Sequence, residues 1–269
     1  MLNNVTIGQF FPGDSYLYHL DPRTKLILTI AMIVLVFIAK SFIGFALVFL
    51  FVLWCALSTK IGMKYMLKGL KPLLVIIGLT FFLNLFLLRD GEDLLHFGII
   101  RITTGGVRMA VFMAVRLILL VLCSQVLTLT TSPIALTDAM ESLMKPLTRF
   151  KFPAHEISMM MSIALRFIPT LMEETNKIQR AQMARGADFE SGKLIARAKA
   201  MIPLLVPLFV SAFRRADELA MAMEARCYRG GEGRTKMKQL HYGWRDGEAF
   251  TVVALMFAVM ILLNRYAPF

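Results

Sequence analysis

The sequence of 269 residues is poor in cysteine, histidine and charged side chains, and each shortage excludes a class of function. Its three cysteines, Cys55, Cys123 and Cys227, form no CxxC pair, which argues against a disulfide framework or a zinc site. The four histidines are scattered, and no two share the helical spacing that would suit a metal ion. Charged residues make up 18% of the chain, against about 25% in a typical soluble domain. We therefore expect no bound metal and no cofactor.

The sequence also lacks the motifs that would make it an enzyme. It contains no GxxxxGK[ST] phosphate-binding loop, so the chain is not itself an ATPase. An intramembrane enzyme would need a nucleophile beside a base, or clustered His, Asp and Glu, within its apolar segments, and none is found. Arg116 is the one charge well inside an apolar block, and we interpret it as an anchor that reaches outward. We expect a non-catalytic protein.

Hydrophobic residues make up 57% of the chain and are gathered in long blocks. A helix needs roughly 20 residues, with about 17 workable, to cross about 30 Å of hydrocarbon. Only Lys40 and Ser41 separate the first two blocks, which are short, so we predict a tight helical hairpin there. The fold class predicted is an all-α membrane protein with about five transmembrane helices and three further helices at the cytoplasmic surface. The apolar blocks are 26–39, 42–57, 72–88, 109–129 and 249–263.

The net charge of +12 lies mostly in two stretches, 60–71 and 130–247. Positive residues concentrate in cytoplasmic loops, so we expect both stretches and the N-terminus inside a bacterial cell and the C-terminus outside. This topology accounts for the basic charge, and no nucleic-acid partner is expected. We divide the chain into an N-terminal four-helix transmembrane region at 1–130, a cytoplasmic coupling region at 131–247, and a C-terminal transmembrane helix at 248–269.

Three helices are predicted in the coupling region, at 132–147, 154–185 and 193–226, of which the last two are long and cross each other. Residues 157–172 and 201–213 are apolar on nearly every face, whereas the rest of each long helix is charged. A helix that lies obliquely at the cytoplasmic surface places one half in lipid and the other half in water. We therefore predict two interfacial helices whose polar ends face the cytoplasm.

The two long helices share a layout of proline, acidic pair and terminal arginine. Pro169 in the first, and Pro203 with Pro207 in the second, are predicted to bend the helices where they leave the bilayer. A terminal arginine offers a planar fork of donors suited to docking; alternatively, it only complements the helix dipole. The residues alone do not favour docking over the dipole interpretation, or the reverse. The helix ends read Ala184, Arg185, Gly186 and Ala225, Arg226, Cys227.

Further motifs are Leu20–Lys25 (LDPRTK), Leu165–Pro169 (LRFIP) and Glu224–Gly230 (EARCYRG). Together with the helix ends, and in this order over essentially the whole chain, they make the sequence resemble EcfT, the transmembrane coupling component of energy-coupling factor transporters. The resemblance implies a complex with two ABC-type ATPase subunits and a vitamin-binding membrane S component, or several interchangeable ones. It also implies that Arg185 and Arg226 each dock in a groove of one ATPase, so that ATP binding moves the helices and reorients the S component.

One position departs from the family pattern, because Cys227 stands where the second motif has glycine. Cysteine tolerates positive φ poorly, which leaves open whether the chain turns at Cys227 or the helix continues to Gly230. The function has alternatives as well. A coupling subunit dedicated to a cobalt or nickel importer is one, and a self-sufficient secondary carrier is another, although carriers usually have more helices, in repeated sets.

Overall fold

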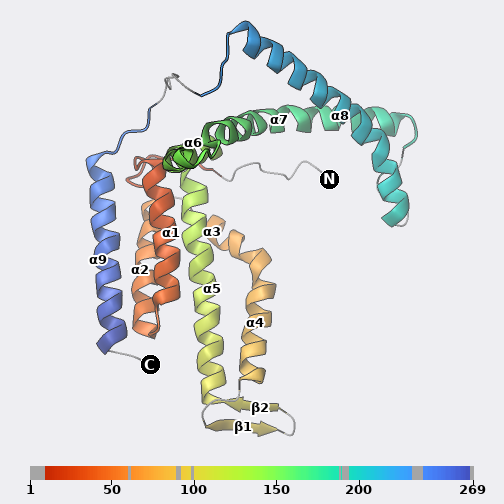
Figure 1. Cartoon of the computed structure of the whole chain (residues 1–269). Helices are drawn as coiled ribbons and strands as arrows, with labels where there is room; N and C mark the ends of the chain where they lie inside the picture. Colours follow the sequence, from red (N-terminus) through yellow and green to blue (C-terminus); the bar gives the residue numbers. More distant parts are fainter. Residues whose placement is uncertain are drawn as a thin grey trace. The chain divides into compact units, whose positions relative to one another are not determined.

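The computed structural model describes residues 10–59, 62–88, 92–97, 100–187, 189, 194–231 and 239–266. The described chain is helical apart from one two-stranded hairpin and the connecting segments, which confirms the predicted all-α membrane class. The helices are α1 Pro22–Ile38, α2 Phe42–Ser58, α3 Met63–Leu70, α4 Leu74–Leu87, α5 Thr104–Thr130, α6 Pro133–Met144, α7 Ala154–Ala184, α8 Leu194–Ala225 and α9 Trp244–Tyr266 (Figure 1).

The chain folds as two compact units. Residues 8–139 and 240–269 form the first, here named the bundle unit, and residues 140–239 belong to the second, the helix-pair unit. The division falls within α6, and α9 packs with α1 and α2 in the bundle unit. The boundaries predicted from the sequence, after residues 130 and 247, remain predictions.

Helix α5 is the centre of the bundle unit, because α1, α2, α3 and α4 all pack against it (Figure 1). An apolar core lies between α1, α2, α5 and α9, with Leu35, Val48, Leu119 and Met260 shielded from solvent. Helix α4 lies against α5 with Ile77 as its one buried residue, and most of its other apolar side chains, Val75 and Leu87 among them, are exposed. Such a surface is suited to lipid or to another membrane protein.

Three helices of the described chain are long and apolar enough to cross a membrane, namely the stretch Lys68–Leu87, α5 and α9. Helix α2 is apolar but, at 17 residues, shorter than these three. Helix α1 is also 17 residues long. The turn between α1 and α2 is tied to α9, since Asn264 accepts a hydrogen bond from the Lys40 N–H at 3.2 Å and donates to the Ile38 carbonyl at 2.8 Å. The short turn between α1 and α2 is therefore present, whereas tight packing of these two helices on each other and the count of five spans remain predictions.

Arg116 does not reach outward as expected, but bonds within the bundle. Its Nη2 donates to the carbonyl of Ala39 at 3.2 Å, and its guanidinium lies 5.0 Å from the ring centroid of Phe112 and 5.7 Å from that of Phe45. Ala39 is the C-cap of α1, where carbonyls lack helical partners. Arg116 therefore supplies the missing donor to α1, with aromatic faces around its charge.

Two segments that join the predicted spans contain regular secondary structure. The lysine-rich stretch 60–71 contains α3, whose Met66 and Leu70 are buried while Lys68 is exposed; Lys60 lies outside the described residues. Met66 and Leu70 are four residues apart, which places them on one face of a helix. The lysines between and around them make the stretch polar on average, so its hydropathy alone does not indicate a helix. Between α4 and α5, β1 Asp93–Phe97 pairs antiparallel with β2 Ile100–Thr103.

Candidate docking site at the helix ends

Helices α7 and α8 begin and end within one residue of the ranges predicted for the long coupling helices. Pro169 lies inside α7, and Pro203 and Pro207 lie inside α8, yet both helices continue without a break through these positions. The three prolines are exposed. The two helices contact each other and cross, as Figure 1 shows. That the prolines bend the helices remains a prediction.

The end of α7 closes in a Schellman turn, in which two amides bond back into the last turn of the helix. The Gly186 N–H donates to the Met183 carbonyl and the Ala187 N–H to the Gln182 carbonyl, both at 3.0 Å. This 5→2 and 6→1 pattern defines the motif and needs a left-handed residue after the C-cap. Gly186 supplies it with φ of +86°, which places Arg185 at the C-cap.

The end of α8 has the same turn, although a cysteine takes the place of the glycine. The Cys227 N–H donates to the Glu224 carbonyl at 2.8 Å, and the Tyr228 N–H donates to the Met223 carbonyl at 3.0 Å. Cys227 has φ of +55°, a left-handed conformation that an L residue adopts at a cost. The open question about this end is thereby answered: the chain turns at Cys227, and the helix does not continue to Gly230.

Arg185 and Arg226 thus occupy the same position in two turns of the same geometry. Both side chains are exposed, as are Ala184 and Ala225 before them. Neither arginine forms an ion pair with any residue that the structure describes. A guanidinium in this setting keeps its donors for an outside acceptor, and its charge also suits the negative end of the helix dipole. The geometry therefore fits docking without removing the dipole interpretation.

An ion pair joins α7 to α8, between Glu174 and Arg215 at 2.8 Å. Hydrogen bonding from Ser211 and from Arg215 lowers the pKa of the Glu174 carboxyl below its ordinary value. Both side chains of the pair are partly exposed, so the pair links the two helices but contributes little to the stability of the unit. The sequence showed the acidic residue but not its partner, which lies 41 positions away along the chain.

A second polar cluster lies at the start of α7, and no sequence motif indicated it. Glu141 accepts a hydrogen bond from Ser158 at 2.9 Å and lies 3.1 Å from Nδ1 of His155. Gly231 approaches so closely that a Cβ there would lie 2.6 Å from the His155 ring. The chain beyond α8 therefore returns to the start of α7, and the absence of a side chain at Gly231 permits this contact.

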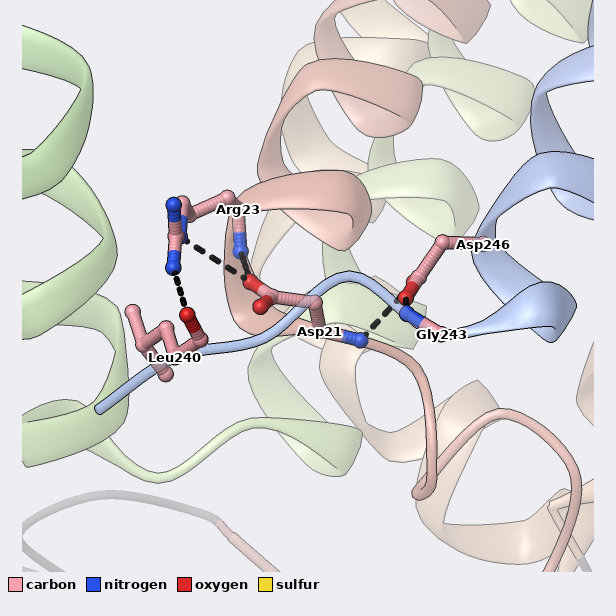
Figure 2. A network of polar contacts seen from close by, with 5 residues as sticks. All are labelled: Asp21, Arg23, Leu240, Gly243 and Asp246. Atoms are coloured by element: carbon pink, nitrogen blue, oxygen red, sulfur yellow. Dashed lines mark hydrogen bonds and ion pairs between the residues drawn. The ribbon is translucent and has the colours of Figure 1, made fainter. Parts of the chain in front are cut away.

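The LDPRTK segment serves the start of α1 in the bundle unit. Figure 2 shows Asp21, which caps the helix by accepting from the Arg23 N–H at 2.8 Å, while its own N–H donates to Asp246 Oδ1 at 2.9 Å. The other oxygen of Asp246 accepts from Gly243 at 2.7 Å, and Arg23 donates to the Leu240 carbonyl. Asp21 and Asp246 are both buried, so this network fastens the start of α1 to the start of α9.

Within the described ranges, no three His, Cys, Asp or Glu side chains are grouped so as to hold a metal ion. The two buried cysteines, Cys55 and Cys123, are free thiols, and Cys227 is exposed. The chemistry that the helix ends offer is therefore recognition by hydrogen bonds and charge, from two arginines at matching positions.

Comparison with known proteins agrees with this description. A family model described as a cobalt transport protein, CbiQ, matches residues 13–237. The chain is 54% identical over 265 residues to the energy-coupling factor transporter transmembrane protein EcfT of Thermosediminibacter oceani. This match covers 98% of this chain and 99% of that protein. It is 51% identical over 269 residues to the EcfT of Ruminiclostridium cellulolyticum, over 100% of both chains. The EcfT of Bacillus subtilis is 46% identical over 264 residues, covering 98% of this chain and 100% of its own length.

These similarities extend over nearly the full length of each relative and confirm the resemblance seen in the sequence. The chain belongs to the CbiQ family, and within it to the EcfT transmembrane components of energy-coupling factor transporters.

Proposed function

We propose that this chain transmits ATP-driven motion from two ATPase subunits to a substrate-binding S component, for uptake of a vitamin or another micronutrient, and catalyses no reaction itself. The observation that carries the proposal is the pair of exposed arginines in identical turns at the ends of α7 and α8. Two like turns present the same groups in the same geometry, so each suits one of two like partners. A planar guanidinium in such a turn fits a carboxylate or carbonyl groove by paired hydrogen bonds.

The exposed apolar surface of α8 supports the part of the proposal that concerns the S component. Phe213, Phe209 and Val206 are 69%, 60% and 58% exposed, and they lie in the middle of the helix, at least 13 residues before Arg226. A large apolar surface of this kind marks a protein or membrane contact. The S component is itself a membrane protein and would bind this apolar surface of α8. A displacement of the Arg226 end of α8 would then be transmitted through the same helix to the S component.

We place the N-terminus and the helix-pair unit in the cytoplasm of a bacterial cell and the C-terminus outside. The excess of lysine and arginine in 60–71 and 130–247 supports this orientation. ATPase subunits require cytoplasmic ATP, which agrees with arginine-tipped ends on that side of the membrane.

The test is a charge reversal at both ends, Arg185→Glu together with Arg226→Glu, in the full transporter. We expect the variant to insert in the membrane but to lose both ATPases in a pull-down and to lose ATP-driven uptake. A matched control is Arg180→Glu with Arg214→Glu, which makes the same charge change on exposed positions within α7 and α8. Normal uptake and ATPase retention in the first variant, or equal loss in the control, would contradict the docking assignment.

Two alternatives are distinguished by what co-purifies with the tagged chain. The cobalt transport description of the family model keeps open a subunit dedicated to a cobalt or nickel importer, which would bring down a single S component. A shared subunit would bring down several. A self-sufficient carrier would come out alone and would exclude the proposal.

A further inference from the structure

A cavity of about 640 Å³ lies in the bundle unit, lined by α1, α2, α5, α9 and the segment before α1. Sites for small ligands usually measure roughly 300 to 1,000 Å³. Its floor is buried, with Cys55, Cys123 and Val253 each less than a tenth exposed, whereas Trp54 and Val252 at its edge are about half exposed. The cavity therefore opens sideways from the bundle, on a protein whose surroundings are a bilayer.

Most of the polar groups of the cavity are gathered at one end. Lys25 lies in the first turn of α1, Ser58 and Thr130 are the last residues of α2 and α5, and Glu248 lies near the start of α9. The lining farther along each helix is almost entirely apolar. Along α1 the lining extends from Lys25 to Met32, about 10 Å of helix, with Thr29 as its one polar residue beyond Lys25. A molecule with a polar head and an aliphatic chain matches this division.

Lys25 places a buried cation at the polar end of the cavity. Its side chain is nine-tenths buried, and Nζ donates to the Tyr18 carbonyl at 3.3 Å and to the Thr130 carbonyl at 3.2 Å. An ammonium has three donors, so among the described residues one donor has no hydrogen-bond partner. Asp21 and Asp246 lie close enough to act on the Lys25 charge, but both already accept backbone N–H groups and neither forms an ion pair with Lys25.

We propose that this cavity binds one phospholipid from the adjacent leaflet, with an acyl chain along the apolar wall and the phosphate against the Lys25 ammonium. The position of Lys25 supports this occupant, because its ammonium lies where α1 begins and α5 ends, at the level where transmembrane helices meet lipid headgroups. Burial in apolar surroundings strengthens such a charge-assisted bond relative to one in water.

The sequence contains two tryptophans, Trp54 and Trp244, which makes the test direct. Trp54 lines the cavity, whereas Trp244 is 85% exposed and donates to Glu248 at 2.7 Å. In a Trp244→Phe background, Trp54 is the sole reporter. The full chain, in mixed micelles, is titrated with a phospholipid that carries bromine on its acyl chains. We expect saturable quenching of Trp54 at a low mole fraction of this lipid.

Two variants separate the cavity from lipid that merely surrounds the protein. Ala249→Phe fills the cavity, and Ala254→Phe is its matched control on an exposed position of α9 outside the lining. We expect the first to abolish saturable quenching and the second to leave it unchanged. Lys25→Gln removes the ammonium, and loss of one charge-assisted bond should weaken binding about tenfold. Because no ATPase is present, the result is independent of the proposed function.

Three outcomes would overturn the proposal. Quenching that rises linearly with mole fraction in every variant would show surrounding lipid only. Equal behaviour of Ala249→Phe and Ala254→Phe would place the lipid elsewhere. Saturation by a brominated free fatty acid but not by the brominated phospholipid would show that the anion is a carboxylate from another source.

Discussion

The turns at the ends of α7 and α8 differ at one position, where Gly186 stands in the first and Cys227 in the second. Both have positive φ, +86° and +55°. A left-handed conformation costs an L residue roughly 1–2 kcal/mol, whereas glycine loses roughly 0.5–1 kcal/mol more in chain entropy on folding. The balance favours glycine by about 0.5–1 kcal/mol. We predict that Cys227→Gly stabilises the α8 turn, and that Gly186→Ala destabilises the α7 turn, by about this amount.

Nothing else in either turn changes this value. A Cβ at Gly186 would meet no atom within 4 Å, so the penalty of Gly186→Ala comes from the backbone alone. Cys227 is exposed, so little packing is lost when its thiol is removed. Since about 1.4 kcal/mol is a tenfold change in an equilibrium constant, each substitution should shift the closing of its turn by about two- to fivefold.

Hydrogen exchange measures this closing through the amides that complete the turns. The Tyr228 N–H bonds to the Met223 carbonyl, and the Ala187 N–H bonds to the Gln182 carbonyl. Exchange should slow about two- to fivefold at the first in Cys227→Gly, and quicken by the same factor at the second in Gly186→Ala.

The control is Cys227→Ala, which removes the thiol but keeps an L residue in the left-handed conformation. It should exchange like the natural protein. If Cys227→Ala slowed exchange as much as Cys227→Gly did, the thiol rather than the backbone would be responsible, and the reasoning would be refuted.

Three further predictions concern polar contacts. Because the pKa of the Glu174 carboxyl is lowered in the folded chain, its pair with Arg215 is present at neutral pH and is lost as pH falls through that lowered pKa. Glu174→Gln should remove this pH dependence of α7 and α8 amide exchange, at a cost of at most about 1 kcal/mol. Asp246→Ala, which leaves the buried N–H of Asp21 without an acceptor, should cost about 1–3 kcal/mol and lower the apparent Tm in detergent. Arg116→Met should lower the apparent Tm similarly but leave ATPase retention in a pull-down unchanged, because its contacts lie within the bundle unit.

The sequence predicted the two long helices well because their signals are local. Prolines, apolar runs and stop residues such as Gly186 lie within the helices or directly beyond them, which is why α7 and α8 differ from the predicted ranges by one residue. The contacts that hold elements together are of another kind. Arg215 meets Glu174 across 41 positions, and Arg116 meets Ala39 across 77. Periodicity carries no information on such pairs.

At Cys227 the backbone preference of cysteine and the parallel with the α7 turn predict different structures. Backbone preference alone favours continuing α8, because cysteine rarely has positive φ. The parallel with the α7 motif favours a turn, and the structure has the turn. The motif prevails because the hydrogen bonds of the Schellman turn offset a cost of about 1–2 kcal/mol.

The shortness of α1 and α2 has a consequence for the bilayer itself. Each helix of 17 residues rises about 25 Å, roughly 5 Å less than the hydrocarbon thickness of a typical membrane. Lys40 at the tip of this hairpin is exposed, and it is held beside Asn264 at the far end of α9. For α1 and α2 to span the membrane as predicted, the lipids around the hairpin would have to compress, at a cost of fractions of a kcal/mol for each ångström. This hydrophobic mismatch would make the length of the surrounding acyl chains part of the energetics of the protein, and thinner bilayers should suit it best.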